Sequence, residues 1–271
     1  MSVAKVKHPH VLRAALAADS LAMTPHWIYD PAKILERFGV VDHLMVPPEG
    51  TYHYGQPLGG QTHLGHQTIV LARTLEDGWD RQRFEQNWRA FWADSTSYQD
   101  KATKNALEGN LGASDELGGA SRIGAVIAAV DEPSEARRIA REQAALTHTA
   151  EVAETAAQLT GLAYQLLDGQ SLSAAVRQAF ADHDALQRAE RVLKERPNEA
   201  VGELGRDCSL RSALPSVLYF LLNSTSLRQT LIDNVMAGGD SAARGLVLGS
   251  LLAASMGPEA IPRSWLDELR W

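Results

Sequence analysis

The stretch that decides the fold lies near the end of the chain: Gly238-Gly239-Asp240-Ser241-Ala242-Ala243-Arg244-Gly245, which continues as an apolar run to Ala254. Two adjacent glycines permit backbone angles that other residues avoid. The side chain of Asp240 or Ser241 can then accept hydrogen bonds from the free N–H groups that open a helix. The pattern therefore predicts a tight glycine turn, a polar cap and a buried helix.

Small residues recur along this predicted helix. Ser241, Gly245, Gly249 and Ala253 are spaced four residues apart, so they share one face. A face without bulky side chains lets a neighbouring helix approach closely. We therefore expect Asp240 to be fixed at a crowded helix start, a position that also suits a metal ion or an anion.

Composition favours an all-α protein. Of the 271 residues, 45% are hydrophobic but only 6% are aromatic, and alanine and leucine are abundant, which suits close helix packing. No stretch between the helical segments resembles a linker, so we expect one domain over residues 1–271.

Charge and cysteine content exclude some partners and compartments. The net charge is −7 and no basic cluster is present, so neither nucleic acid nor an anionic membrane is an expected partner. The single cysteine, Cys208, rules out an internal disulfide and fits a reducing compartment. No segment approaches the roughly 20 uninterrupted apolar residues that a membrane span needs. These features predict a cytoplasmic protein.

Helical spacing and breakers divide most of the chain into helices. A long loop, residues 47–65, is rich in Gly, Pro, Tyr and His, and loops of this length are usually functional. Roughly a dozen helices are expected, among them residues 11–23, 31–38, 67–76, 81–93, 98–108, 120–130, two within 133–167, 172–181, 184–196, 210–222 and 227–236.

Four motifs, in order along nearly the whole chain, resemble the ADP-ribosylglycohydrolase family. They are Ala18-Asp19-Ser20-Leu21-Ala22-Met23, Gln61-Thr62-His63, Gly119-Ala120-Ser121-Arg122-Ile123 with Leu146-Thr147-His148, and the glycine turn followed by Ile261-Pro262-x-x-Trp265. The resemblance implies an orthogonal multi-helix bundle. It also implies hydrolysis of the bond from ADP-ribose to a protein side chain or small acceptor, at two Mg²⁺ ions held by carboxylates.

The sequence departs from the family pattern at the metal ligands that the resemblance implies. The family's Thr-Asp-Asp is Thr62-His63-Leu64 here, and the glutamate after the first helix falls on His26. The second aspartate and the threonine of the C-terminal turn are Ala242 and Ala243. Among the implied carboxylates Asp240 alone remains, and neutral imidazole or alanine cannot replace the missing charge and oxygen ligands. An ordinary dimagnesium centre is therefore not expected.

Three interpretations of this site remain open. A variant hydrolase would hold zinc, manganese or iron with nitrogen and oxygen ligands. A metal-free hydrolase would use a carboxylate base and water. An inactive, crystallin-like relative would keep the pocket only to bind a nucleotide or a protein. The candidate metal ligands are His26, Thr62, His63, His66 and Asp240, and the candidate bases are Asp19, Asp115 and Asp240.

Five residues are candidates for contact with an ADP-ribosyl or related nucleotide-sugar partner, whether a small molecule or a modified protein: Trp27, Tyr29, Arg122, His148 and Ser241. Each also has a structural interpretation. Trp27 and Tyr29 could pack down the loop, His148 could mark a helix boundary, and Asp240 could be a helix cap alone. A buried Arg122 would need a carboxylate partner, for which Asp115, Glu116 and Asp19 are available.

Overall fold

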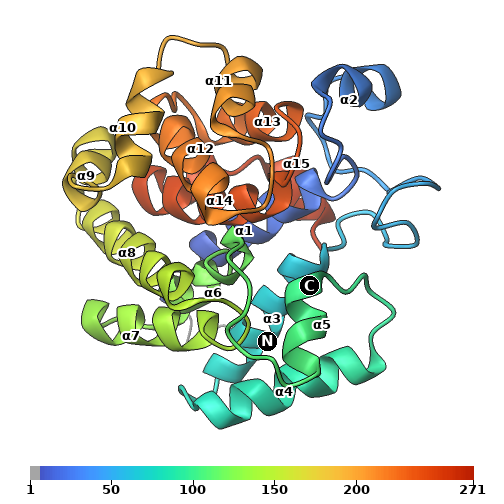
Figure 1. The fold of residues 1–271 in the computed structure, drawn as a ribbon, viewed down its shortest axis with the longest axis vertical. Helices are drawn as coiled ribbons and strands as arrows, with labels where there is room; N and C mark the ends of the chain where they lie inside the picture. The colour runs from blue at the N-terminus through green and yellow to red at the C-terminus, as the bar shows by residue number, and fades with distance from the viewer. Residues whose placement is uncertain (1–6) are drawn as a thin grey trace.

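The structure, a computed structural model, describes residues 7–271 as a bundle of α-helices (Figure 1). The elements are α1 (Pro9–Ala22), α2 (Pro31–Phe38), α3 (His63–Leu75), α4 (Arg81–Asp94), α5 (Lys101–Leu107), η2 (Leu117–Gly119), α6 (Ile123–Ala129), α7 (Pro133–Ala144), α8 (Ala150–Leu167), α9 (Leu172–Ala179), α10 (Asp184–Arg191), α11 (Pro197–Leu204), α12 (Leu210–Leu222), α13 (Leu227–Met236), α14 (Ser241–Met256), η3 (Pro258–Ala260) and α15 (Arg263–Glu268). Within this described range the extended pairing is limited to isolated bridges at Ser114–His148 and Glu116–Ser209. The all-α prediction is confirmed.

Two helices begin later than the sequence predicts. The helix expected from Tyr98 starts at Lys101, because the Asp100 side chain accepts a hydrogen bond from the Thr103 N–H at 2.7 Å and so caps the helix there. The helix expected from Ala120 starts at Ile123. A 3₁₀ turn precedes it, and the Ser121 hydroxyl donates to the Gly118 carbonyl at 2.7 Å.

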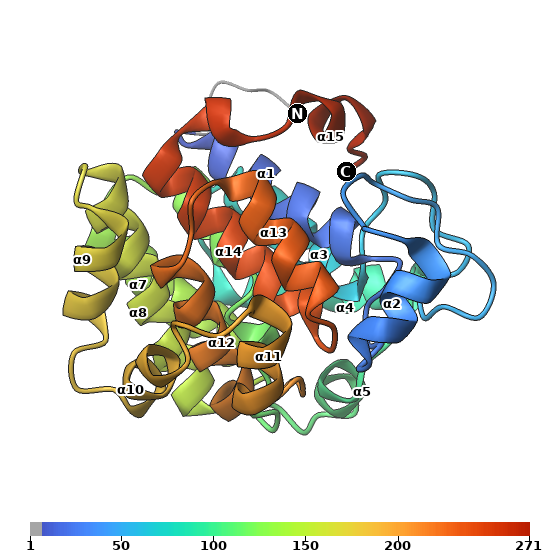
Figure 2. The same cartoon turned by 90° about the horizontal axis from the view of Figure 1, so that it is seen from above.

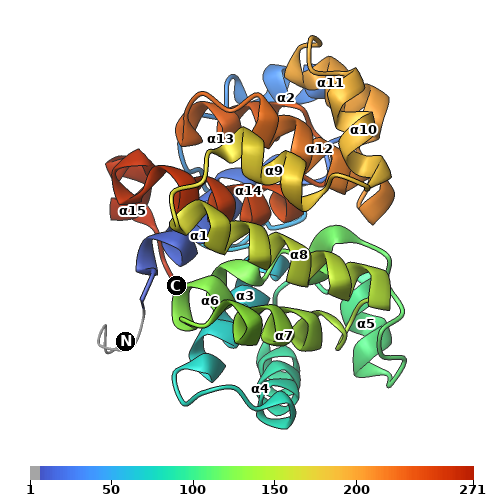
Figure 3. The same ribbon diagram turned by 90° about the vertical axis from the view of Figure 1, so that its left-hand side faces the viewer.

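Helix α14 is the centre of the bundle, as its apolar sequence predicts. All its residues from Ser241 to Ala254 are buried. It packs against α1, α6, α8, α12 and α13, and Figure 2 shows α1, α13 and α14 in the middle of the molecule. Helices α7 and α8 lie side by side on one flank (Figure 3).

The small-residue face of α14 meets α1, as the spacing predicts. A Cβ atom added at Gly249 would lie 2.6 Å from the Ala14 carbonyl oxygen, and one at Gly245 would lie 3.3 Å from that of Ala18. The backbones of the two helices are therefore in contact. Leu12 and Leu16 on α1 face a second core, so α1 is buried on both sides.

The glycine turn before α14 is tied to the segment after α1. Gly238 and Gly239 have φ angles of +77° and +73°. The Gly239 N–H donates to the Ile28 carbonyl at 2.8 Å, and the Trp27 N–H donates to the Gly239 carbonyl at 3.0 Å. Asp240 caps α14 by accepting from the Ala243 N–H at 3.4 Å. The predicted turn and cap are confirmed.

The contact between α1 and α14 predicts the effect of one added methyl group. Gly249→Ala forces a Cβ against backbone atoms that cannot move aside, so we expect the free energy of unfolding to fall by about 1–3 kcal/mol. In the control Gly161→Ala on α8, the added Cβ meets only the flexible Arg137 side chain, at 3.3 Å. The control should be neutral or gain up to about 1 kcal/mol in helix propensity. Urea unfolding of both variants measures the difference, and equal midpoints would contradict the packing argument.

Candidate functional site

Asp19 on α1 is fully buried and is held by the start of α3. Its two carboxylate oxygens accept from the Thr62 N–H at 2.7 Å and the Thr62 hydroxyl at 2.6 Å. A Cβ at Gly65 would lie 2.2 Å from the same carboxylate, so only glycine fits there. Burial raises the pKa of Asp19 to about 6, although the Thr62 hydrogen bonds oppose the shift. The hydrogen bonds between Asp19 and Thr62 therefore fix the end of α1 to the start of α3.

Three buried imidazoles lie beside this pair, and we call His26, His53 and His63 the histidine cluster. They come from the segment after α1, from the long loop and from the first turn of α3. Their ring centroids are 5.4 to 5.8 Å apart. One ligand nitrogen from each lies within 4.8 Å of the other two. The fold thus gathers three potential metal ligands that are far apart in sequence.

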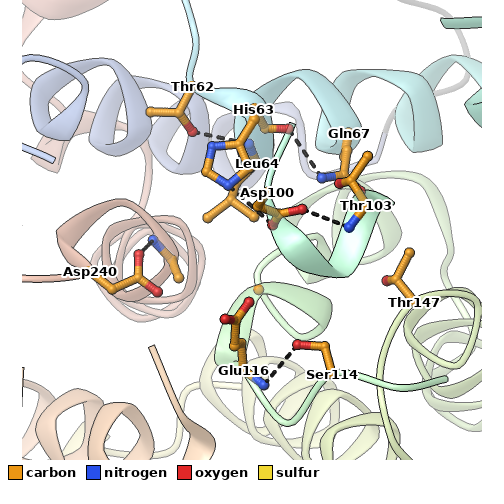
Figure 4. A network of polar contacts seen from close by, with 12 residues as sticks. Thr62, His63, Leu64, Gln67, Asp100, Thr103, Ser114, Glu116, Thr147 and Asp240 are labelled. Atoms are coloured by element: carbon orange, nitrogen blue, oxygen red, sulfur yellow. Dashed lines mark hydrogen bonds and ion pairs between the residues drawn. The ribbon is translucent and has the colours of Figure 1, made fainter. Parts of the chain in front are cut away.

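Two members of the cluster have a carboxylate beside one ring nitrogen. His63 Nε2 lies 3.3 Å from Asp100 Oδ2, and His26 Nδ1 lies 3.7 Å from Asp240 Oδ1. Burial opposes protonation of His63, but Asp100 outweighs it and the pKa of His63 is raised. The pKa of Asp100 is lowered, since its hydrogen bond and attraction to His63 exceed the cost of burial. Figure 4 shows His63 and Asp100 joined in this way.

The other two imidazoles are held neutral. Burial, with repulsion from His53 and His63, lowers the pKa of His26 well below its usual value. Burial also lowers the pKa of His53 to about 3, with further contributions from His63 and His66. At neutral pH both rings therefore present lone pairs rather than charges.

Aromatic rings cover the histidine cluster. The Trp27 ring lies 4.3 Å from that of His26 and 5.3 Å from that of His63, with Tyr52 and Tyr98 against its edges at 4.8 and 5.2 Å. Trp27 has a φ of +62°, which is unfavourable for a bulky residue. Its N–H bond to Gly239 helps hold that conformation. The predicted packing of Trp27 against the loop is therefore seen, and it shields the imidazoles from water.

Glu116 brings a carboxyl group to the same region. Its side chain is partly exposed, and Figure 4 shows it pointing into the space that Asp240 also borders. Burial, together with repulsion from Asp100 and Asp240, raises the pKa of Glu116 to about 7. The neighbouring Asp115 is an exposed residue whose carbonyl accepts from the Leu210 N–H at 2.8 Å. Glu116 is therefore a group of this turn that faces the site and titrates near neutrality.

Arg122 has neutral partners, so the expectation of a carboxylate partner is wrong. Its guanidinium donates to the side-chain oxygens of Gln143 at 2.6 Å, Gln67 at 2.8 Å and Thr147 at 2.9 Å. Amide and hydroxyl oxygens are thus sufficient acceptors for this buried cation, whose pKa burial lowers to about 10. His148 lies beside it with Nδ1 2.7 Å from the Thr147 hydroxyl oxygen.

The remaining candidates are more dispersed. His66 lies on α3 but turns its ring toward Phe91 on α4, with centroids 5.5 Å apart, and is not part of the histidine cluster. Ser241 is fully buried in the first turn of α14, while Tyr29 is 49% exposed. Burial raises the pKa of the Cys208 thiol, with Asp240 and Glu116 adding to the shift, so this cysteine is not a ready nucleophile. The contacts with a nucleotide sugar predicted for Tyr29 and Ser241, and the metal-ligand role predicted for His66, stay predictions.

Sequence reasoning missed three site residues: His53, Asp100 and Glu116. His53 lies in the loop singled out for its composition, but no spacing rule relates it to His26 or His63. Asp100 has the sequence signature of a helix cap, three residues before Thr103. Glu116 directly follows the candidate Asp115, and no pattern in the sequence distinguishes the two carboxylates. The structure does bring together Asp19, His26, Thr62, His63 and Asp240 from the predicted set.

Comparison with known proteins identifies the family. The sequence model of the ADP-ribosylglycohydrolase family matches residues 10–271. The chain therefore belongs to the ADP-ribosylglycohydrolase family. It is 26% identical over 188 residues to ADP-ribosylhydrolase ARH3 of Bos taurus, covering 55% of this chain and 52% of that protein. The Homo sapiens ARH3 matches to the same extent. The chain spans about half the length of these curated relatives.

A solved structure confirms the fold. A chain described as ADP-ribosylglycohydrolase-related protein complex superposes with a TM-score of 0.77 at 24% sequence identity, over 96% of this chain and 92% of that one. The predicted family bundle is therefore confirmed. Across residues 7–271 no helix has the length and apolar character required to traverse a bilayer.

The side chains present do not fit the pair of magnesium ions that the family resemblance implies. Magnesium requires hard oxygen ligands in near-octahedral array. Here the buried ligand atoms at the centre are imidazole nitrogens. Both oxygens of Asp19 already accept from Thr62, and an oxygen of Asp240 accepts from the α14 backbone.

Titration of Glu116 predicts a pH-dependent stability in metal-free protein. Its pKa is about 7 in the fold against 4.5 for the free side chain, so the folded state binds more protons and stability falls as pH rises between these values. Glu116→Gln removes this loss. After allowance for solvent screening, we expect the variant to gain roughly 1–2 kcal/mol over wild type between pH 4.5 and 8.

Denaturant unfolding at several pH values in the presence of a chelator measures this difference. Glu108→Gln, the same change at an exposed position, is the matched control and should follow the wild-type curve. Parallel curves for wild type and Glu116→Gln would show that Glu116 is not a coupled group of the site.

Proposed function

We propose that this chain hydrolyses an ADP-ribosyl or related N-glycosidic linkage. Two facts support the proposal. The chain belongs to a family named for this reaction, and its site contains a carboxyl group whose proton affinity suits acid–base work. Glu116, partly exposed and with a pKa of about 7, is the observation on which the proposal rests. A group with a pKa near the working pH is the most effective proton donor or acceptor.

Glu116 and Asp240 take different roles in this proposal. Glycosidic cleavage passes through a positively charged, oxocarbenium-like state and needs a proton at the leaving group. Glu116 donates that proton in its neutral form and then accepts one from the attacking water. Asp240, buried at the start of α14, supplies negative charge beside the ribose. Its pKa is raised by burial, an effect that the charges of Arg244 and His63 oppose.

An inactive relative is the second candidate, because one observation favours it. His26, His63 and Leu64 are each less than 5% exposed and lie at the positions where the resemblance implies metal ligands or their neighbours. Trp27 packs over two of these residues. Such a filled site would bind a nucleotide or a protein without turnover.

The test measures release of free ADP-ribose from peptides that carry it on a hydroxyl or a guanidinium side chain. We expect release by the wild-type protein, falling as pH rises through about 7 because Glu116 must be protonated. Glu116→Gln should be slower by about 10²–10⁴-fold, the usual contribution of general acid–base catalysis. Glu108→Gln should match wild type. Binding of ADP-ribose in calorimetry without release would instead support the inactive relative, and absence of both would contradict the hydrolase and the nucleotide-binding form of the inactive relative.

A further inference from the structure

Several ring nitrogens of the histidine cluster lack a hydrogen-bond partner among the described residues. Among the described residues, neither Nδ1 nor Nε2 of His26, nor Nε2 of His53, nor Nδ1 of His63 has a hydrogen bond, and each of these atoms is shielded from solvent. Buried polar groups are nearly always paired, because desolvation without a partner costs about 1–3 kcal/mol each. Unpaired nitrogens on three adjacent rings therefore call for a ligand that accepts lone pairs.

The distances suit a single small cation. Three atoms no more than 4.8 Å apart surround a centre that is at most about 2.8 Å from each of them. A Zn–N bond to histidine is about 2.0–2.1 Å long, so each ring must shift by less than about 1 Å to bind. Side-chain rotation alone can supply such a shift.

Two carboxylates lie where they could orient the imidazole rings of a metal site. A histidine that binds a metal through one nitrogen usually donates its other N–H to a carboxylate, which orients the ring. Asp100 lies beside Nε2 of His63, and Asp240 lies beside Nδ1 of His26. The remaining nitrogens of these two rings are thereby left for a metal. The two carboxylates also offset the charge of a divalent ion.

We propose that the histidine cluster binds one divalent transition metal ion of the zinc class, in place of the family's pair of magnesium ions. Imidazole ligands select zinc and its neighbours, whereas magnesium prefers oxygen. Trp27, packed on His26, excludes water from one side of the ion. The site stands independently of the hydrolase proposed above, because a metal-binding site in an inactive protein would have the same ligands.

The test titrates Zn²⁺ into full-length protein that has been stripped with a chelator, using calorimetry and metal analysis. We expect one Zn²⁺ per chain, and no comparable heat from Mg²⁺ at the same concentration. His53→Gln should weaken zinc binding by at least about 100-fold, since it removes a ligand. Asp100→Asn should weaken it by about 10–100-fold, because the cap of α5 is kept while the outer carboxylate is lost.

Controls separate loss of a ligand from loss of the fold. His43→Gln changes a largely exposed histidine outside the cluster and should bind zinc as wild type does. Thermal unfolding in chelator should give similar midpoints for wild type, His53→Gln and His43→Gln. Co²⁺ bound to the wild type should give the visible spectrum of a low-coordinate nitrogen site, and His53→Gln should lose it.

Three results would overturn the proposal. They are the absence of zinc binding by wild-type protein, equal zinc affinity of wild type and His53→Gln, and loss of zinc binding in His66→Gln while His53→Gln retains it. The last result would move the site to the face of α3 toward Phe91. None of these results bears on release of ADP-ribose by Glu116, so failure of the two proposals can be told apart.

Discussion

The close approach of α1 and α14 is the constraint on which the rest of the structure depends. Gly245 and Gly249 let the two backbones touch, with Gly249 against the carbonyl of Ala14. This contact sets Asp19, near the end of α1, in the same region as Asp240, at the start of α14. The hydrogen bonds between Gly239 and the segment at Trp27 and Ile28 then lock the turn after α1 onto the turn before α14. A bulkier face on α14 would separate the two ends and disperse the site.

The chemistry of the site follows from desolvation more than from any single charge pair. His26 and His53 are so well buried that their neutral forms are favoured, while the pKa of His63 is raised because the charges of Asp100, and to a smaller extent Asp240 and Asp19, outweigh its burial. The pKa of Glu116, which is partly exposed, is raised by burial and by the negative charges of Asp100 and Asp240. One region of the protein thus contains neutral metal-ligand candidates in its interior and a carboxyl group that titrates near neutrality at its edge.

Family membership and the side chains of the site imply different metal ligands. The chain belongs to the ADP-ribosylglycohydrolase family, yet imidazoles occupy positions where the family resemblance implies carboxylates. Magnesium prefers oxygen ligands, whereas zinc also binds imidazole nitrogen, so the two implied ligand sets favour different ions. The proposed zinc site would keep the family fold and change the ion that it holds.

The sequence by itself determined most of the helices, the glycine turn, the cap at Asp240 and the small-residue face, because these depend on local backbone freedom and on side-chain spacing along one helix. Through its resemblance it also pointed to Asp19, His26, Thr62 and His63. Only the tertiary structure decided which distant side chains meet: His53 rather than His66 joins the cluster, Asp100 pairs with His63, and neutral oxygens rather than a carboxylate hold Arg122. These choices depend on how loops cross between helices, and no periodicity in the chain encodes a contact between residues 27 or 37 positions apart.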